Sequence, residues 1–147
     1  MAKDHYFRQL TGHEEEAVSV IDNRDLTQSN NKLLLICERA SNDLKGTQTD
    51  YKEKSLLLGH DAFDPGAADL SNYISERTKC IALHTNFSRL LIDPSKPIAS
   101  DQLVPLQYID GSFVSFNKDG FDLQDRLSNY YLIYHKVLSE MIWFLNP

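Results

Sequence analysis

The sequence feature that most constrains the fold is a predicted helix between two short apolar runs. Asp64 followed by Pro65 predicts a helix start, because a carboxylate accepts the unpaired amides of the first turn and proline suits the first helical position. The apolar residues that follow at helical spacing are Ala67, Leu70 and Ile74. They predict one apolar stripe and a helix end near Thr78. Because the runs 33–37 and 80–83 have the length of strands, the segment predicts a β–α–β unit.

The flanking runs indicate how the sheet is built. Residues 33–37 are continuously apolar, which is typical of a strand covered on both faces. Residues 17–21 alternate well enough for a short edge strand. Cys37 and Cys80 each lie in an apolar run, which suits buried, reduced thiols in the cytoplasm. The first run leads into the polar residues 38–43, and ligands bind at such carboxyl ends of strands in open α/β sheets.

The whole chain of 147 residues suits a single domain. Its net charge of −6 argues against a nucleic-acid-binding surface, which needs clustered Lys and Arg. No run reaches the roughly 20 apolar residues of a membrane span, and no secretory signal peptide is recognised, so we expect a cytoplasmic protein. Residues 1–16 are polar and predict a solvated tail before a domain over 17–147.

The remaining segments differ in how clearly they predict structure. Residues 45–58 favour a short helix that ends before Gly59. Residues 94–120 are rich in turn signals, at Asp110-Gly111 and Asp119-Gly120 among others. The clearest periodicity belongs to residues 123–142, which predict a helix of more than five turns ending in an apolar segment before Pro147.

Two pairs of residues are candidates for a functional site. His60 and Asp64, next to the positive end of a helix, could bind a metal or an anion, or act as an acid–base pair. From spacing alone, the simpler interpretation is that Asp64 caps the helix and His60 is a surface histidine. Arg89 could bind a substrate carboxylate, or form a structural ion pair with Asp93. The side chains that core packing or a strand end explains better are His84, Tyr131, Tyr134 and His135.

Five parts of the sequence resemble motifs of the N-formylglutamate amidohydrolase family. Residues 35–42 resemble its apolar strand followed by Cys-Glu/Asp-His-Ala-Ser-Asn, and residues 60–67 resemble His-x-Ala-Trp-Asp-x-Gly-Ala. Residues 88–97 are similar to Ser-Arg-Leu-x-x-Asp-x-Asn-Arg-Pro. Asn117 corresponds to the asparagine of a Pro-Gly-Asn turn, and residues 131–135 resemble a Tyr-x-Pro-Tyr/Phe-His helix.

The resemblance implies a three-layer α/β/α fold with a mostly parallel sheet, similar to zinc exopeptidases. It implies a hydrolase that uses Zn²⁺ to split an N-formyl or N-acyl amino acid into formate and the free amino acid. In this reaction a zinc ion would polarise the formyl oxygen and lower the pKa of its bound water towards ~7. The implied ligand is thus a small-molecule N-formyl amino acid.

The resemblance also implies roles for individual residues. His60 and Asp64 would face the metal or its water, and Asp64 and Glu38 would be the catalytic carboxylates. Arg89 would bind the carboxylate of the substrate. The residues expected to line the pocket are Ser41, Asn42, Ser88 and Asn117. Those expected to orient the metal and substrate groups are Asp93 and His135.

The sequence departs from the family pattern at several positions. Arg39 replaces the histidine of the first motif, and a guanidinium repels a metal ion instead of binding it. Ser95 and Lys96 replace Asn-Arg, and Ile133 replaces the proline of the helix motif. The chain also stops before the family's His-Ser-Phe motif, so a domain truncated at its carboxyl end is expected.

Three hypotheses follow from the motifs and the departures. The chain is a hydrolase of this type, or a catalytically silent member or fragment that acts as a binding or structural subunit. The third hypothesis is a helical interaction module over residues 121–145. Truncation would leave apolar surface without its neighbours, so we expect a protein partner or a second copy to cover residues 121–147.

Overall fold

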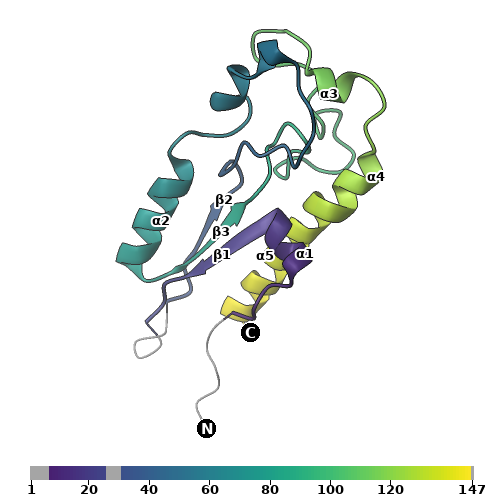
Figure 1. Cartoon of the computed structure of the whole chain (residues 1–147). Helices are drawn as coiled ribbons and strands as arrows, with labels where there is room; N and C mark the ends of the chain where they lie inside the picture. Colours follow the sequence, from purple (N-terminus) through teal and green to yellow (C-terminus); the bar gives the residue numbers. More distant parts are fainter. Residues whose placement is uncertain (1–6, 26–30, 147) are drawn as a thin grey trace.

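The computed structural model describes residues 7–25 and 31–146, and within them it is an α/β fold built on a three-stranded sheet (Figure 1). Strands β1 (Val18–Asp22), β3 (Ile81–Thr85) and β2 (Leu34–Cys37) lie side by side in that order. β2 runs parallel to β3, whereas β1 is antiparallel to it. The predicted α/β class is confirmed, but the sheet is mixed where a mostly parallel sheet was expected.

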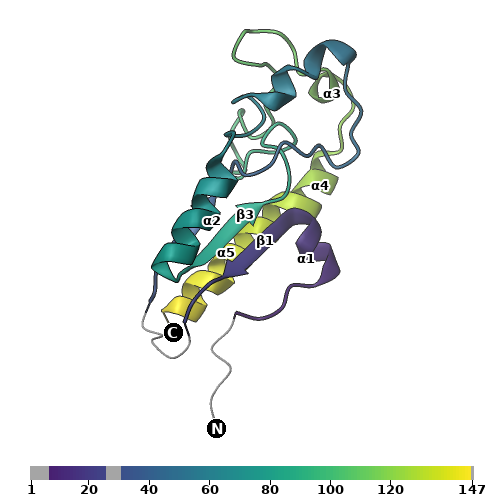
Figure 2. The same ribbon diagram turned by 60° about the vertical axis from the view of Figure 1, so that its left-hand side comes forward.

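The predicted β–α–β unit is present as β2, helix α2 (Ala67–Thr78) and β3. Figures 1 and 2 show α2 and helix α5 (Leu132–Leu145) on opposite sides of the sheet. On the α2 side, His84 of β3 hydrogen-bonds Ser71 at 2.9 Å. On the α5 side, Leu83 lies in the main apolar cluster with Val137 and other residues of α5. Successive side chains of a strand point to opposite faces, so those of β3 contact α2 on one face and α5 on the other.

The start of α2 differs from the prediction. Gly66 precedes the helix with φ of 84°, and the carbonyl of Asp64 accepts a hydrogen bond from the amide of Ala67. The Asp64 side chain is therefore not the helix cap, because a left-handed glycine re-directs the chain before the first turn. The predicted end at Thr78 is confirmed.

The predicted apolar stripe of α2 is wrong. Leu70 is 59% exposed, and the buried residues of the helix are Ser71 and Ser75. Ser71 hydrogen-bonds His84 of β3, and Ser75 donates to the carbonyl of Cys80, directly before β3. These polar contacts fix the orientation of the helix in place of an apolar stripe.

Strand β2 is present where the sequence predicts it but is not covered on both faces. It lies at the edge of the sheet, and Leu33 and Ile36 are 44% and 47% exposed. The edge position is the reason, because one long side of the strand has no neighbour among the described residues. Cys37 and Cys80 are buried and free, as predicted.

The amino-terminal segment is packed, not a solvated tail, from residue 7 onward. Thr11 and Glu14 form a capping box at the start of helix α1 (Gly12–Ala17). Glu14 is only 4% exposed and forms ion pairs with Arg8 and Lys136. Because Glu14 forms an ion pair with Lys136 of α5, this polar segment packs against that helix. Residues 1–6 of the predicted tail lie outside the described residues.

The segment predicted as a short helix over 45–58 contains two short 3₁₀ helices, η1 (Tyr51–Glu53) and η2 (Leu56–Leu58). Residues 94–120 are irregular, as predicted, and contain only the short helix α3 (Ser115–Lys118). The predicted turns include Gly111 and Gly120, both with positive φ.

The long carboxyl-terminal helix is confirmed, with one local irregularity. It consists of α4 (Leu123–Arg126), the π-helical turn η3 (Leu127–Tyr131) and α5, without a break. At its end Trp143 is 72% exposed. Among the described residues, no helix is both long and apolar enough to cross a membrane.

Candidate functional site

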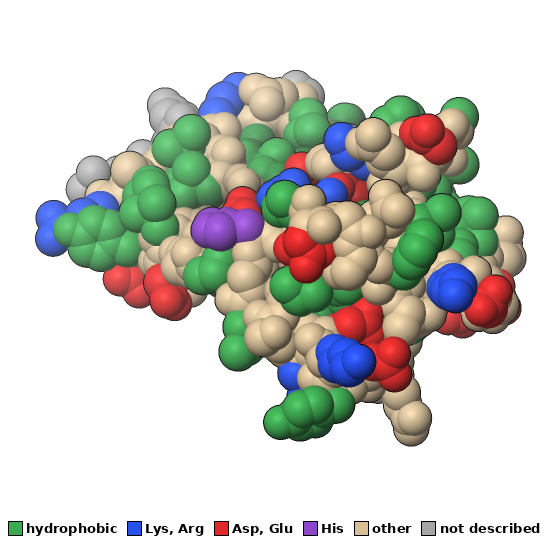
Figure 3. Space-filling model, turned by 90° about the horizontal axis from the view of Figure 1, so that it is seen from above, with side chains coloured by type: hydrophobic (Ala, Val, Ile, Leu, Met, Phe, Trp, Pro, Cys, Tyr) green, Lys and Arg blue, Asp and Glu red, His purple; other side chains and the backbone are tan. Residues whose placement is uncertain are grey.

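The candidate site begins where β2 ends. Arg39 Nη1 lies 3.3 Å from Asp64 Oδ1, and His60 Nδ1 lies 3.3 Å from the same oxygen. The backbone carbonyl of Arg39 also accepts a hydrogen bond from the Asp64 amide, at 3.0 Å. We call Arg39, His60 and Asp64 the Asp64 cluster. Figure 3 shows histidine, acidic and basic side chains gathered at this end of the molecule.

Glu38 connects the end of β2 with α5. Its Oε1 accepts a hydrogen bond from the Tyr134 hydroxyl at 2.8 Å, and its backbone carbonyl accepts one from Thr85 at 3.0 Å. Tyr134 is fully buried, and burial together with the Glu38 carboxylate raises the pKa of Tyr134 far above its usual value. Tyr134 is thus a hydrogen-bond donor that holds Glu38, and it packs in the core as the sequence also predicts.

The chemistry of Cys37, directly before Glu38, is limited by its surroundings. Burial raises the pKa of the Cys37 thiol, and the charges of Asp64 and Glu38 raise it further. Since only a thiolate is a strong nucleophile, Cys37 is a buried apolar side chain and not a reactive one.

Arg89 lies in a different environment from the Asp64 cluster. Its Nε donates to Asp93 Oδ2 at 3.0 Å, and Asp93 is almost completely buried. Arg89 lines a pocket of about 480 Å³ whose apolar wall includes Leu106 and Phe113. Among the described residues, no hydrogen bond or ion pair joins Arg89 to Glu38 or to the Asp64 cluster. The Arg89–Asp93 pair that the sequence left as an alternative is therefore formed.

Ser88 links the Arg89 turn to the segment that carries Asp64. It is fully buried, and its Oγ donates to the carbonyl of Ala62 at 2.9 Å. The Ser88 amide donates to the carbonyl of Asp43 at 2.8 Å. Ser88 thus joins the segment 88–97 to the segment 60–67, and to Asp43 directly after the segment 35–42.

Ser41 and Asn42 shape the loop after β2. Ser41 Oγ accepts a hydrogen bond from the Asp43 amide at 3.1 Å, and Asn42 Nδ2 donates to the carbonyl of Leu57 at 2.9 Å. Both side chains are partly exposed. They hold the loop in place while leaving part of their surface to solvent.

Asn117 and His135 are used in contacts within the chain. Asn117 is buried, and its Nδ2 donates to the carbonyls of Leu90 and Pro105, both at 2.7 Å. His135 Nε2 lies 3.1 Å from the carbonyl of Pro94, and its ring packs on Tyr131. In the described structure these two residues hold the loop 90–105 against the long helix.

Arg126 is a buried residue that the sequence analysis did not single out. Its Nη1 donates to the carbonyl of Leu91 and to Asn117 Oδ1, at 2.7 and 2.6 Å. Its guanidinium also lies over the ring of Phe121. The signal that could have revealed it is a charged residue on the apolar face of the helix, eight residues before Tyr134.

The expected zinc ion requires enough metal-ligating side chains close together. Within residues 7–25 and 31–146, no group of three or more His, Cys, Asp and Glu side chains could hold a metal ion. His60 and Asp64 offer two donors, and Arg39 contacts the Asp64 oxygen that faces His60. A catalytic zinc uses three protein ligands, so these residues, as they are arranged, do not complete a site for it.

Comparison with known proteins finds a likeness to a solved structure. No family model matches the sequence, and no curated protein matches it. A crystal structure of gene product Atu2144 from Agrobacterium tumefaciens is similar, with a TM-score of 0.72 and 27% sequence identity. The match covers 90% of this chain and 52% of that one, so this chain spans about half the length of its structural neighbour. The likeness supports the α/β fold.

Proposed function

We propose that this chain carries a site of the N-formylglutamate amidohydrolase type, whose ligand is an N-formyl or N-acyl amino acid. The reaction of such a site is metal-dependent hydrolysis to formate and the free amino acid. The proposal includes a three-layer, zinc-exopeptidase-like α/β/α fold in a cytoplasmic protein.

The observation that carries the proposal is that the motif-like segments contact one another. Arg39 and Asp64 are 25 residues apart in the sequence, and Glu38 and Tyr134 are 96 apart, yet both pairs are in contact. An arrangement of this kind is what a shared site needs, because its groups must reach one small molecule. It also gives the resemblance a spatial basis that a match of single motifs would lack.

The residues of this chain would act on the ligand in distinct ways. Glu38, whose carboxylate Tyr134 holds, would accept or return a proton at the formyl amide. Arg89 still has its Nη groups for a ligand carboxylate, because its Nε is the atom that donates to Asp93. Ser41 and Asn42 would line the space beside Glu38. We derive no step through Zn²⁺, since the donors present do not complete its site.

A catalytically silent binding domain is the second candidate, and a specific contact favours it. Arg39 stands where the family motif has a histidine. Its guanidinium, which is always positively charged, lies next to the Asp64 carboxylate. A guanidinium there neutralises the carboxylate that a metal would use and adds a group that can bind an anion. Binding of the ligand without turnover is the behaviour that this contact favours.

Zinc titration combined with an assay of formate release from N-formyl-L-glutamate separates the two candidates. Tight 1:1 zinc binding and formate release by the unmodified chain would support the hydrolase and exclude the silent domain. Ligand binding without formate release would support the silent domain. Failure of both binding and release would refute the proposed site altogether.

The variant Arg39→His tests the assignment of the metal position. Restoring the motif histidine should increase zinc affinity, because a cation is replaced by a third donor beside His60 and Asp64. The matched control is Arg77→His on α2, which adds a histidine at an exposed position away from the Asp64 cluster. Equal zinc affinities of the two variants would contradict the assignment.

A further inference from the structure

The outer edge of β2 is unlike the usual edge of a sheet. Residues 33–37 are Leu-Leu-Leu-Ile-Cys, and they contain no charge, proline or glycine to discourage pairing with another strand. Leu33 and Ile36 are 44% and 47% exposed. Helix α2 packs beside this strand and has two more exposed apolar side chains, Leu70 and Tyr73.

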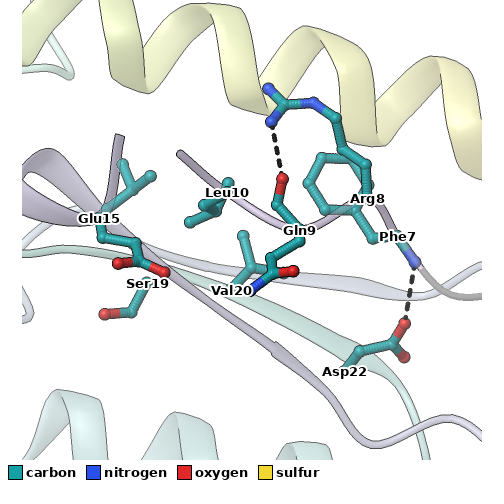
Figure 4. A pocket seen from close by; sticks show the side chains of 9 residues that line it. Phe7, Arg8, Gln9, Leu10, Glu15, Ser19, Val20 and Asp22 are labelled. Atoms are coloured by element: carbon teal, nitrogen blue, oxygen red, sulfur yellow. Dashed lines mark hydrogen bonds between the residues drawn. The ribbon is translucent and has the colours of Figure 1, made fainter. Parts of the chain in front are cut away.

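The opposite edge of the sheet, at β1, shows the protection that β2 lacks. Figure 4 shows Phe7 and Leu10 lying beside β1, with the Phe7 amide bonded to Asp22. Asp22 also forms an ion pair with Arg24 at 2.6 Å. The β1 edge thus has neighbouring chain and charged groups. Along the outer edge of β2, by contrast, no other strand pairs within residues 7–25 and 31–146, and the side chains of the strand are apolar.

We propose that the β2 edge pairs with the β2 edge of a second copy of this chain, forming a two-fold dimer with one continuous six-stranded sheet. The sequence of the strand supports self-pairing. In antiparallel register centred on Leu35, Lys32 lies opposite Glu38 of the second copy, and the same pair repeats at the other end. Between these charged ends only apolar residues face each other.

The two-fold arrangement also accounts for the exposed residues of α2. A two-fold axis through Leu35, perpendicular to the sheet, places both copies of α2 on the same face and next to each other. Leu70 and Tyr73 then lie on helices that adjoin the interface, and Ile36 is covered from the other copy. A different protein that supplies a strand would lack the reciprocal Lys32–Glu38 match.

Sedimentation equilibrium of the full chain tests the dimer. We expect a reversible monomer–dimer equilibrium that Ile36→Lys weakens by at least about tenfold, because the added ammonium group would be buried at the interface. Lys32→Glu should also weaken it, since it places carboxylates opposite each other. The matched control is Trp143→Lys, which adds the same charge at an exposed apolar site on α5 and should leave the equilibrium unchanged.

Each outcome decides for or against the β2 interface. Amide hydrogen exchange of the unmodified chain should slow at residues 33–37 as the protein concentration rises, and this readout needs no variant to fold. A chain that stays monomeric at all concentrations overturns the proposal. So does a dimer that Trp143→Lys disrupts and Ile36→Lys does not, a result that would place the interface on residues 121–147.

Discussion

Replacing Asn117 with alanine should destabilise the protein strongly, because its carboxamide joins three parts of the chain in the interior. The side chain donates to the carbonyls of Leu90 and Pro105 and accepts from Arg126, all within 2.6–2.7 Å. Asn117→Ala removes a partner from each of these three groups. Each buried group left unpaired costs about 1–3 kcal/mol, but Arg126 keeps its hydrogen bond to the Leu91 carbonyl. We therefore expect a loss of about 3–5 kcal/mol in the free energy of unfolding, less than three full penalties.

Urea denaturation followed by circular dichroism measures this loss. A loss of 3–5 kcal/mol is large beside the roughly 5–15 kcal/mol that stabilises a typical domain. Asn129→Ala is the matched control, because Asn129 bonds Asp125 at an exposed position on the helix; it should change the stability by less than about 0.5 kcal/mol. A loss below about 1 kcal/mol for Asn117→Ala would refute the interpretation of Asn117 as a structural junction.

Three further predictions concern buried polar groups. Tyr134→Phe should lower the unfolding free energy by about 1–2 kcal/mol, because Glu38 loses its hydrogen-bond donor; unchanged stability in urea would contradict this contact. Burial raises the pKa of Glu53, but hydrogen bonds from Ser115 outweigh it and the pKa lies below its usual value. The contribution of Glu53 is therefore present above pH about 4.3 and lost as the pH falls, so Glu53→Gln should flatten the acid limb of stability against pH. Burial lowers the pKa of His84; its contribution is present above pH about 6.5 and lost below it. A stability profile of His84→Gln as steep as the original between pH 5 and 7 would be evidence against that shift.

The positions of the strands could be predicted from the sequence better than the burial of their side chains. Continuous apolar runs located β2 and β3, and the parallel pairing of these strands follows from the helix between them. The same runs could not reveal that β2 is an edge strand, because coverage depends on which other strands are present. Apolar composition alone made 33–37 look like a central strand, whereas Leu33 and Ile36 are nearly half exposed.

Helix α2 shows why periodicity misjudged a buried face. Leu70 was expected to face the core, but Ser71 and Ser75 do so because they hydrogen-bond β3 and the residue directly before it. Specific polar contacts of this kind depend on residues far away in the sequence. The same holds for Asp64. Its carboxylate was expected to cap the helix, but it contacts Arg39 and His60 instead.

The candidate site was predictable in part. Local sequence located Glu38, Asp64 and Arg89 near the ends of strands or helices, and Asp64 does meet residues that follow β2. The separate environment of Arg89 depends on the irregular segment 94–120, whose path is set by buried contacts such as those of Asn117. Periodicity carries no information about such a path.

The most direct test of the account is a titration of the isotope-labelled chain with N-formyl-L-glutamate, followed by amide chemical shifts. The account predicts saturable shifts grouped in residues 38–42, 60–66 and 131–135, which meet at the end of β2, with a smaller group around Arg89. Shifts absent from all three segments at the end of β2 at millimolar ligand, or confined to other parts of the chain, would contradict the claim that these three segments form one ligand-binding site.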